Sequence, residues 1–178
     1  MNSTPSQLSF QLDELKLDPT DRSALTIFLE VARNSIASEN ADGTPVEKNP
    51  NYGPARLLIM GTADASPLAL AEALATQLGV ELYKVQLGEV VSKFIAQTEK
   101  NLESIFDVAQ SENWILFFDE ADALFGQRTE HFTHQEVGYI LQHLERFGGP
   151  AILVTRNVIE PPADILGRFQ AVVRLSKV

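Results

Sequence analysis

Cysteine is absent from this 178-residue sequence. Without thiols the chain cannot form disulfides, hold an iron–sulfur cluster through cysteine, or use a cysteine nucleophile. The absence fits a reducing compartment, and we expect a cytoplasmic protein. Histidine is scarce too: His131, His134 and His143 lie around one predicted helix without the spacing of a metal site, so we expect no histidine-bound metal.

Long apolar runs and a basic leader are also missing. No stretch approaches the roughly 20 apolar residues that cross a bilayer, and the first thirty residues do not resemble a signal peptide. Basic residues are outnumbered, with 14 Lys and Arg against 24 Asp and Glu, which gives a net charge of −10. Because that charge repels phosphate backbones and anionic lipids, we expect neither nucleic acid nor a membrane as a partner.

The chain length fits a single domain that buries roughly 70% of its unfolded surface. Residues 1–19 are polar with scattered leucines, and 21–38 carry apolar residues at helical spacing. We therefore divide the sequence into an N-terminal arm and helix, 1–54, and a core, 55–178. The first segment is either part of the same domain or a docking segment.

The core alternates between two apolar periods, which is typical of repeated βαβ units. Strands are predicted at Arg56–Met60, Leu82–Leu87, Trp114–Phe118, Ala151–Thr155 and Ala171–Leu175. Strands such as "ILFF" are apolar at every position, as expected when helices cover both faces of a parallel sheet. We predict an α/β fold: a three-layer α/β/α sandwich with a five-stranded, mainly parallel sheet. One helix should open at Thr133 with a capping box to Glu136 and end at Gly148-Gly149.

Ligands of open parallel sheets bind at the carboxyl ends of the strands. At one such end "WILFFDEADALFGQR" runs from four apolar residues directly into Asp119 and Glu120. A carboxylate placed there can hold the water shell of a magnesium ion, and its neighbour can orient a water molecule for attack on a phosphate. An acidic turn that merely closes a strand is the alternative.

From Arg56 to about Leu175 the sequence resembles the α/β core of an AAA+ ATPase, a member of the P-loop NTPase superfamily. "FFDEADALFGQR" is similar to the Walker B segment, and "SKFIAQTEKNLESIFDVA" to the substrate loop and the helix after it. "VGYILQHLERFGGPAILVT" and "PADILGRFQAVVRL" resemble the later helix, the sensor strand and the arginine-finger region. The sequence reaches Val178 just past the last predicted strand, so on this resemblance we expect the α/β core without the helical lid that follows it in the family.

The P-loop position departs from the family pattern "GxxxxGK" followed by serine or threonine. "GTADASPL" places Ser66 at the second glycine, Pro67 at the lysine and Leu68 at the hydroxyl residue. The lysine charge, the magnesium-binding hydroxyl and one backbone amide are therefore lost. Ser66 instead suits a helix N-cap and Pro67 the first helical position, while Asp64 adds a negative charge. The degenerate segment comprises Gly61, Thr62, Ala63, Asp64, Ala65, Ser66, Pro67 and Leu68.

Three further parts of the sequence match the AAA+ family pattern only in part. The sensor strand ends in Thr155, Arg156 and Asn157, with the asparagine one step late. Arg168 matches an arginine-finger position, or else it is a surface arginine paired with acidic groups. The aromatic substrate loop corresponds to Lys93, Phe94, Ile95 and Ala96, or else Phe94 packs in the core.

Two functions follow from this reading. The first is a degenerate AAA+ domain, poor or inactive in ATP binding and hydrolysis, that binds or assembles proteins, in one version beside an active AAA+ subunit; no cofactor is then expected. The second is an active AAA+ ATPase that remodels protein complexes. ATP and magnesium would then be its cofactors, with Asp119 on the magnesium, Glu120 on the water and Arg168 acting across a subunit interface.

Overall fold

The structure is a computed structural model that describes residues 17–36, 44, 51–61, 66–90, 95–125, 133–156 and 161–175. Its centre is a five-stranded sheet in the order β2-β3-β4-β1-β5, in which every paired neighbour is parallel. The strands are β1 (Arg56–Gly61), β2 (Leu82–Val85), β3 (Ile115–Phe118), β4 (Ala151–Thr155) and β5 (Ala171–Leu175). The α/β fold and its five-stranded parallel sheet are thus confirmed.

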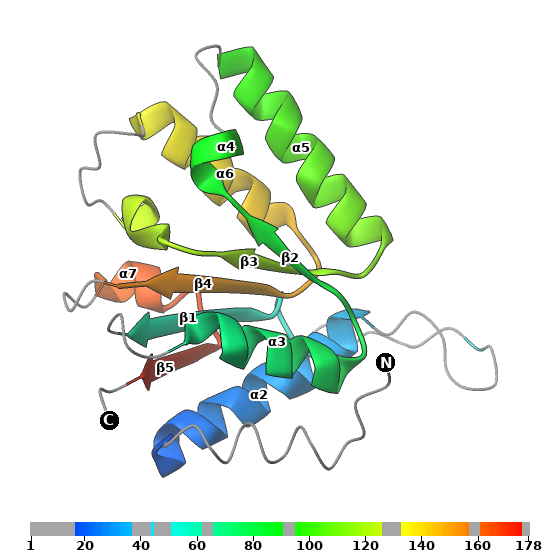
Figure 1. The fold of residues 1–178 in the computed structure, drawn as a ribbon, viewed down its shortest axis with the longest axis vertical. Coiled ribbons are helices and arrows are strands. Elements are labelled where there is room, and N and C mark those ends of the chain that lie inside the picture. Colours follow the sequence, from blue (N-terminus) through cyan, green and yellow to red (C-terminus); the bar gives the residue numbers. More distant parts are fainter. Residues whose placement is uncertain are drawn as a thin grey trace.

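Helices cover both faces of this sheet (Figure 1). The longer helices are α2 (Pro19–Ile36) and α3 (Pro67–Leu78) on one face, and α5 (Ile95–Ser111) and α6 (His134–Arg146) on the other. Shorter turns complete the fold: α4 (Leu87–Val90), the 3-10 helix η1 (Ala121–Phe125) and α7 (Ala163–Leu166). Among the described residues, no helix is both long enough and apolar enough to span a bilayer.

Alternate residues of each strand face opposite helical layers. In β1, Leu57 and Ile59 belong to the core cluster under α2 and α3, whereas Leu58 and Met60 belong to the cluster under α5 and α6. Burial on both faces explains why the central strands are apolar at every position.

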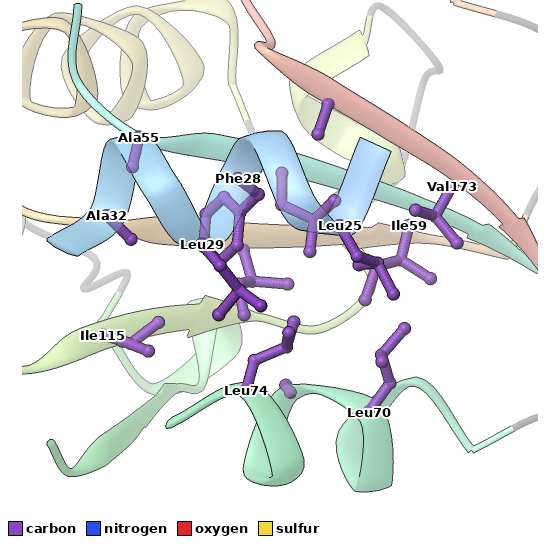
Figure 2. Close-up of a cluster of buried hydrophobic side chains, with 14 of the residues drawn as sticks. Leu25, Phe28, Leu29, Ala32, Ala55, Ile59, Leu70, Leu74, Ile115 and Val173 are labelled. Carbon is purple, nitrogen blue, oxygen red and sulfur yellow. The ribbon is translucent and has the colours of Figure 1, made fainter. Parts of the chain in front are cut away.

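The helix α2 packs directly onto the sheet. Phe28 is fully buried and Leu25 and Leu29 nearly so, and all three lie in the same cluster as Leu70 and Leu74 of α3 (Figure 2). The helical part of the predicted 1–54 segment therefore shares the core of the sheet.

The start of α2 lies two residues before the expected position because of a cap that the apolar spacing does not show. The Asp18 carboxylate accepts the backbone N–H of Asp21 at 2.8 Å, and Pro19 takes the first helical position. Asp21 is buried and its carboxylate accepts the backbone N–H of Arg174 in β5 at 3.1 Å. Burial raises the pKa of Asp21 above its ordinary value, and the nearby negative charge of Asp18 raises it further.

Strand β2 ends two residues earlier than predicted. Leu87 is apolar and buried, but it begins the short helix α4 and contributes to the core from there. The turn is closed by the N–H of Val90, which donates to the carbonyl of Gln86. The apolar character of Leu87 therefore did not mark it as part of the strand, because a buried residue can equally begin the helix that follows.

The capping box of α6 is confirmed. The Thr133 hydroxyl accepts the Glu136 N–H at 3.3 Å, and the Glu136 carboxylate accepts the Thr133 N–H at 2.7 Å. The helix ends earlier than Gly148-Gly149, with Phe147 as its C-cap.

A buried arginine explains where α6 ends. Arg56, the first residue of β1, is only 4% exposed. Its guanidinium donates to the carbonyls of Leu144 at 2.5 Å and Gly149 at 2.7 Å, and also to those of Ala55 and Phe147. Burial lowers its pKa to about 10, so it remains a cation near neutral pH, beside the negative end of the helix dipole.

Candidate functional site

The carboxyl ends of β3, β4 and β2 bring charged side chains together at one edge of the sheet. Asp119 follows β3 directly and is partly buried, with 22% of its side chain exposed. The next residue, Glu120, is exposed and has a positive φ of 55°, an uncommon conformation for a residue with a side chain. Its N–H donates to the Asp119 carboxylate at 3.0 Å, which closes a tight turn.

Two cations approach the Asp119 carboxylate from neighbouring strands. Arg156, directly after β4, places its guanidinium nitrogen 3.2 Å from Asp119 Oδ2 and 3.4 Å from Oδ1. Lys84, near the end of β2, places Nζ 3.8 Å from the same Oδ2. Both cations are about half exposed. The three side chains form an ion cluster, Lys84–Asp119–Arg156, that joins the ends of three adjacent strands.

A second acidic residue fixes the end of β4. The buried Thr155 hydroxyl donates to one Asp122 carboxylate oxygen, and the Arg156 N–H lies 3.4 Å from the other. The last strand residue and the residue after it are therefore tied to η1. Of the predicted sensor residues, Thr155 and Arg156 lie at this edge, and Asn157 lies outside the described residues.

The first turn of the core is described at its two ends, Gly61 and Ser66, while Thr62 to Ala65 lie outside the described residues. The Ser66 hydroxyl accepts the Ala69 N–H at 3.2 Å and Pro67 is the first residue of α3, so the predicted N-cap arrangement is confirmed. Leu68 packs against the core cluster under α2 and α3. A Cβ on Gly61 would come within 3.1 Å of Leu175, so this glycine allows β5 to approach closely.

The remaining predicted residues lie elsewhere. The guanidinium of Arg168 forms an exposed ion pair with Glu145 of α6. Helix α5 begins at Ile95, so Ile95 and Ala96 lie in its first turn rather than in a loop. Lys93 and Phe94 are outside the described residues. The structure thus brings Asp119, Glu120 and Arg156 together, and it places Arg168 in a separate ion pair.

Sequence reasoning missed Lys84 and Asp122. Lys84 is a charged and exposed residue in an otherwise largely apolar strand, one position before its end, and this charge is the signal that could have found it. Asp122 stands three residues after Asp119 within the quoted acidic segment, the spacing of one helical turn. Within the described ranges, no group of three or more His, Asp or Glu side chains is arranged to hold a metal ion.

The five-stranded parallel sheet with helices on both faces is consistent with a P-loop NTPase-like fold, and comparison with known proteins identifies the family. A family model described as "ATPase family associated with various cellular activities (AAA)" matches residues 68–177, more than half of the chain. The chain belongs to this family. The matched region begins one residue after Pro67.

Several curated proteins are similar over part of their length. The uncharacterized AAA family ATPase y4kL of Sinorhizobium fredii is 30% identical over 92 residues, which cover 52% of this chain and 28% of that protein. Proteasome-activating nucleotidase 1 of Haloferax volcanii is 27% identical over 137 residues, which cover 70% of this chain and 34% of that protein. The cell division control protein 48 homolog C of Arabidopsis thaliana is 31% identical over 114 residues, which cover 64% of this chain and 14% of that protein. The chain therefore spans about a third or less of these relatives.

A solved structure supports the fold assignment. A chain of the E. coli MS115-1 HORMA:CdnC:Trip13 complex superposes with a TM-score of 0.68 at 15% identity, over 100% of this chain and 69% of that one. At this identity the likeness concerns the fold.

Proposed function

We propose that this chain is a degenerate AAA domain that binds ATP poorly or not at all and serves as a protein-binding or assembly module. The observation that carries the proposal is the ion cluster at Asp119. In a magnesium–nucleotide site this carboxylate would face a divalent cation. Here its charge is already matched by Lys84 and Arg156, and a metal ion brought to the same oxygens would be repelled by both cations.

The first turn supports the same conclusion, because its polar groups are used within the chain. The Ser66 hydroxyl holds the Ala69 N–H, Pro67 has no N–H to donate, and Leu68 offers no hydroxyl and packs inward. These residues do not suit a magnesium-bound triphosphate, so we derive no hydrolytic step from them.

A protein partner is favoured over nucleic acid. The net charge of −10 opposes nucleic-acid backbones, and the solved chain with the same fold comes from a complex of proteins. One version of the proposal places this chain beside an active AAA+ subunit. The lack of cysteine supports a cytoplasmic location.

A restoring experiment tests the proposal. We expect calorimetric titration of the wild-type chain with magnesium ATP to show no saturable binding. The triple variant Ser66→Gly, Pro67→Lys, Leu68→Thr should gain binding, since it regains the flexible residue, the cation and the hydroxyl. Adding Arg156→Asn should strengthen the magnesium dependence, because it removes the nearer of the two cations beside Asp119.

The matched control replaces lysine by glutamine at position 67 in the same triple variant, which keeps the side-chain length but removes the charge. It should bind at least about tenfold more weakly than the lysine form. Saturable binding of magnesium ATP by the wild-type chain at micromolar concentration would overturn the proposal.

The competing function is an active ATPase that remodels protein complexes. It is favoured by Glu120, which is exposed at the sheet edge directly after Asp119, the place of a water-orienting carboxylate in this family. ATP-dependent phosphate release that disappears in Glu120→Gln would establish it. Phosphate release that is unchanged in Glu120→Gln would be background and would contradict this competing function.

A further inference from the structure

The two outer strands of the sheet, β5 and β2, differ in what covers their outer sides. Helix α2 covers β5, and its buried Asp21 accepts the N–H of Arg174 in that strand at 3.1 Å. At the other end of the strand order, in the described part of the chain, β2 pairs with β3 alone. The outer side of a terminal strand carries unpaired N–H and C=O groups that can bind a further strand.

The register with β3 shows which groups of β2 face outward. The Ile115 N–H donates to the Glu81 carbonyl at 2.9 Å, and Leu82 lies beside Ile115 in the ladder. Alternate residues of a parallel strand bond to the same neighbour, so Tyr83 directs its groups toward β3, whereas Leu82 and Lys84 direct theirs away. Among the described residues, none bonds to these four outward groups, which we call the open row.

The open row is bounded on both sides by groups that the chain already uses. Before it, the N–H of Val80 donates to the Ala75 carbonyl at the end of α3, at 3.1 Å. After it, the Gln86 carbonyl accepts the N–H of Val90 in α4, at 3.2 Å. A long strand would therefore find few groups to bond, whereas a row of the same length matches it completely.

We propose that β2 pairs with β2 of a second copy of this chain, antiparallel and related by a two-fold axis. With the axis at Tyr83, Leu82 of each copy lies opposite Lys84 of the other, and each such pair exchanges two hydrogen bonds. All four groups of both open rows are then bonded. The inference goes beyond the proposed function, because it depends on β2 and not on whether ATP binds.

Neighbouring registers are less favourable. A shift in one direction would place Lys84 opposite Lys84 of the second copy, and like charges at that position repel. A shift in the other direction would place Lys84 opposite Val80, whose N–H is already bonded. The register centred on Tyr83 is therefore the one that the open row favours.

The side chains of β2 suit this pairing. A lysine on an outer strand often prevents association, but Nζ of Lys84 lies 3.8 Å from Asp119 Oδ2, so its charge is held by its own chain. Tyr83 is 38% exposed, and its ring stacks on Trp114 with centroids 5.5 Å apart. In the proposed register the two Tyr83 side chains form a non-hydrogen-bonded pair, where cross-strand aromatic contacts are closest.

Helix α5 leaves room beside this strand. A cleft of about 420 Å³ opens between them, and its walls include Tyr83 and Val85 of β2 and Ser104 and Ile105 of α5. A paired strand would lie roughly 4.8 Å from β2. The helix therefore does not close the approach to the open row.

Because the chain lacks cysteine, a disulfide can report the pairing directly. In the proposed dimer the two Cα atoms at position 83 lie about 4.5 Å apart, within the roughly 4.4–6.8 Å that a disulfide spans. Tyr83→Cys in the full chain should therefore give a disulfide-linked dimer under mild oxidation. Tyr52→Cys is the matched control, since Tyr52 is 37% exposed and contacts Glu30 of α2. We expect Tyr83→Cys to cross-link at least about tenfold faster, because paired thiols have a millimolar effective concentration.

Sedimentation equilibrium of the cysteine-free chain tests the hydrogen bonds. Lys84→Pro removes one outward N–H from each chain, whereas Lys84→Met removes the same charge but keeps the N–H. The wild type and Lys84→Met should form a concentration-dependent dimer. Lys84→Pro should raise the dimer Kd by about tenfold or more, the effect of losing two hydrogen bonds per dimer. Circular dichroism checks its fold, and if it does not fold, the cross-linking comparison decides.

Three outcomes would overturn the proposal: equal cross-linking rates of Tyr83→Cys and Tyr52→Cys, a wild-type chain that stays monomeric over the whole micromolar range, or a dimer that Lys84→Met and a folded Lys84→Pro affect equally. The last outcome would assign the dimer to another surface or to the lysine charge. None of these measurements uses nucleotide, so their failure leaves the ATP-binding test unaffected.

Discussion

Arg56 shows how one residue can determine where two elements meet. It opens an otherwise apolar strand, and its side chain is buried where an arginine is normally costly. The carbonyls at the C-terminal end of α6 compensate that cost, and the Phe147 ring adds a cation–π contact at 5.6 Å. The residue therefore serves as a side-chain cap for a helix that is distant in sequence.

Replacing Arg56 with methionine should destabilise the protein by about 3 kcal/mol, because several buried carbonyls lose a charged donor. The measurement is urea unfolding at neutral pH. Arg146→Met, in the last turn of the same helix but exposed, is the matched control and should cost less than about 0.5 kcal/mol. Equal effects of the two substitutions would show that Arg56 does not hold the helix end.

The sequence predicted the acidic residues of the candidate site but not the cations that pair with them. Asp119 and Glu120 follow an apolar strand directly, so their place at the sheet edge follows from the local pattern. The cations that surround Asp119 come from two other strands, and their meeting depends on the strand order, which local patterns do not contain. Arg56 was missed for the same reason, since its partners lie about 90 residues away.

At the scale of single elements, α3 combines two start signals and one stop signal. Ser66 caps its first turn, Pro67 fixes the first helical residue, and Gly79 ends it with a left-handed φ of 71°. These signals are local and were readable from the sequence. The early end of β2 was not, because Leu87 is apolar in either element and only its packing decides between them.

Ser66→Ala should lower the free energy of unfolding by about 1 kcal/mol, because the Ala69 N–H loses its acceptor. Ser66→Gly should lower the free energy of unfolding by only a few tenths of a kcal/mol, since glycine is also accepted at an N-cap. Thermal melting of the two variants beside the wild type provides the comparison. If alanine were as harmless as glycine, the hydroxyl would not be acting as a cap.

At the scale of the whole molecule, the position of α2 is the main addition to what the sequence predicted. The helical period was plain, but the sequence left open whether this helix docks on a partner or on its own sheet. The buried cluster that contains Phe28 places it on the sheet. We expect α2 and the strands to unfold as one unit.

Phe28→Ala tests this expectation. Loss of a fully buried ring should cost about 3–5 kcal/mol. The neighbouring Ile27→Ala, whose side chain is 48% exposed, is the control and should cost much less. Hydrogen exchange should report weaker protection in β1 and β5 as well as in α2. Loss of protection confined to α2 would instead indicate a separately folding segment.

The position of β1 beside β5 has a consequence for how the protein is made. The backbone N–H of Arg56 donates to the side chain of Gln170 at 2.7 Å, across 114 residues of sequence. On the ribosome, β1 is synthesised long before either strand that flanks it in the finished sheet. Both hydrogen-bonding edges of β1 must stay unpaired until β4 and then β5 have emerged, so the sheet should be completed only after β5 is synthesised, and until then the nascent segment should be a client for chaperones that shield such strands.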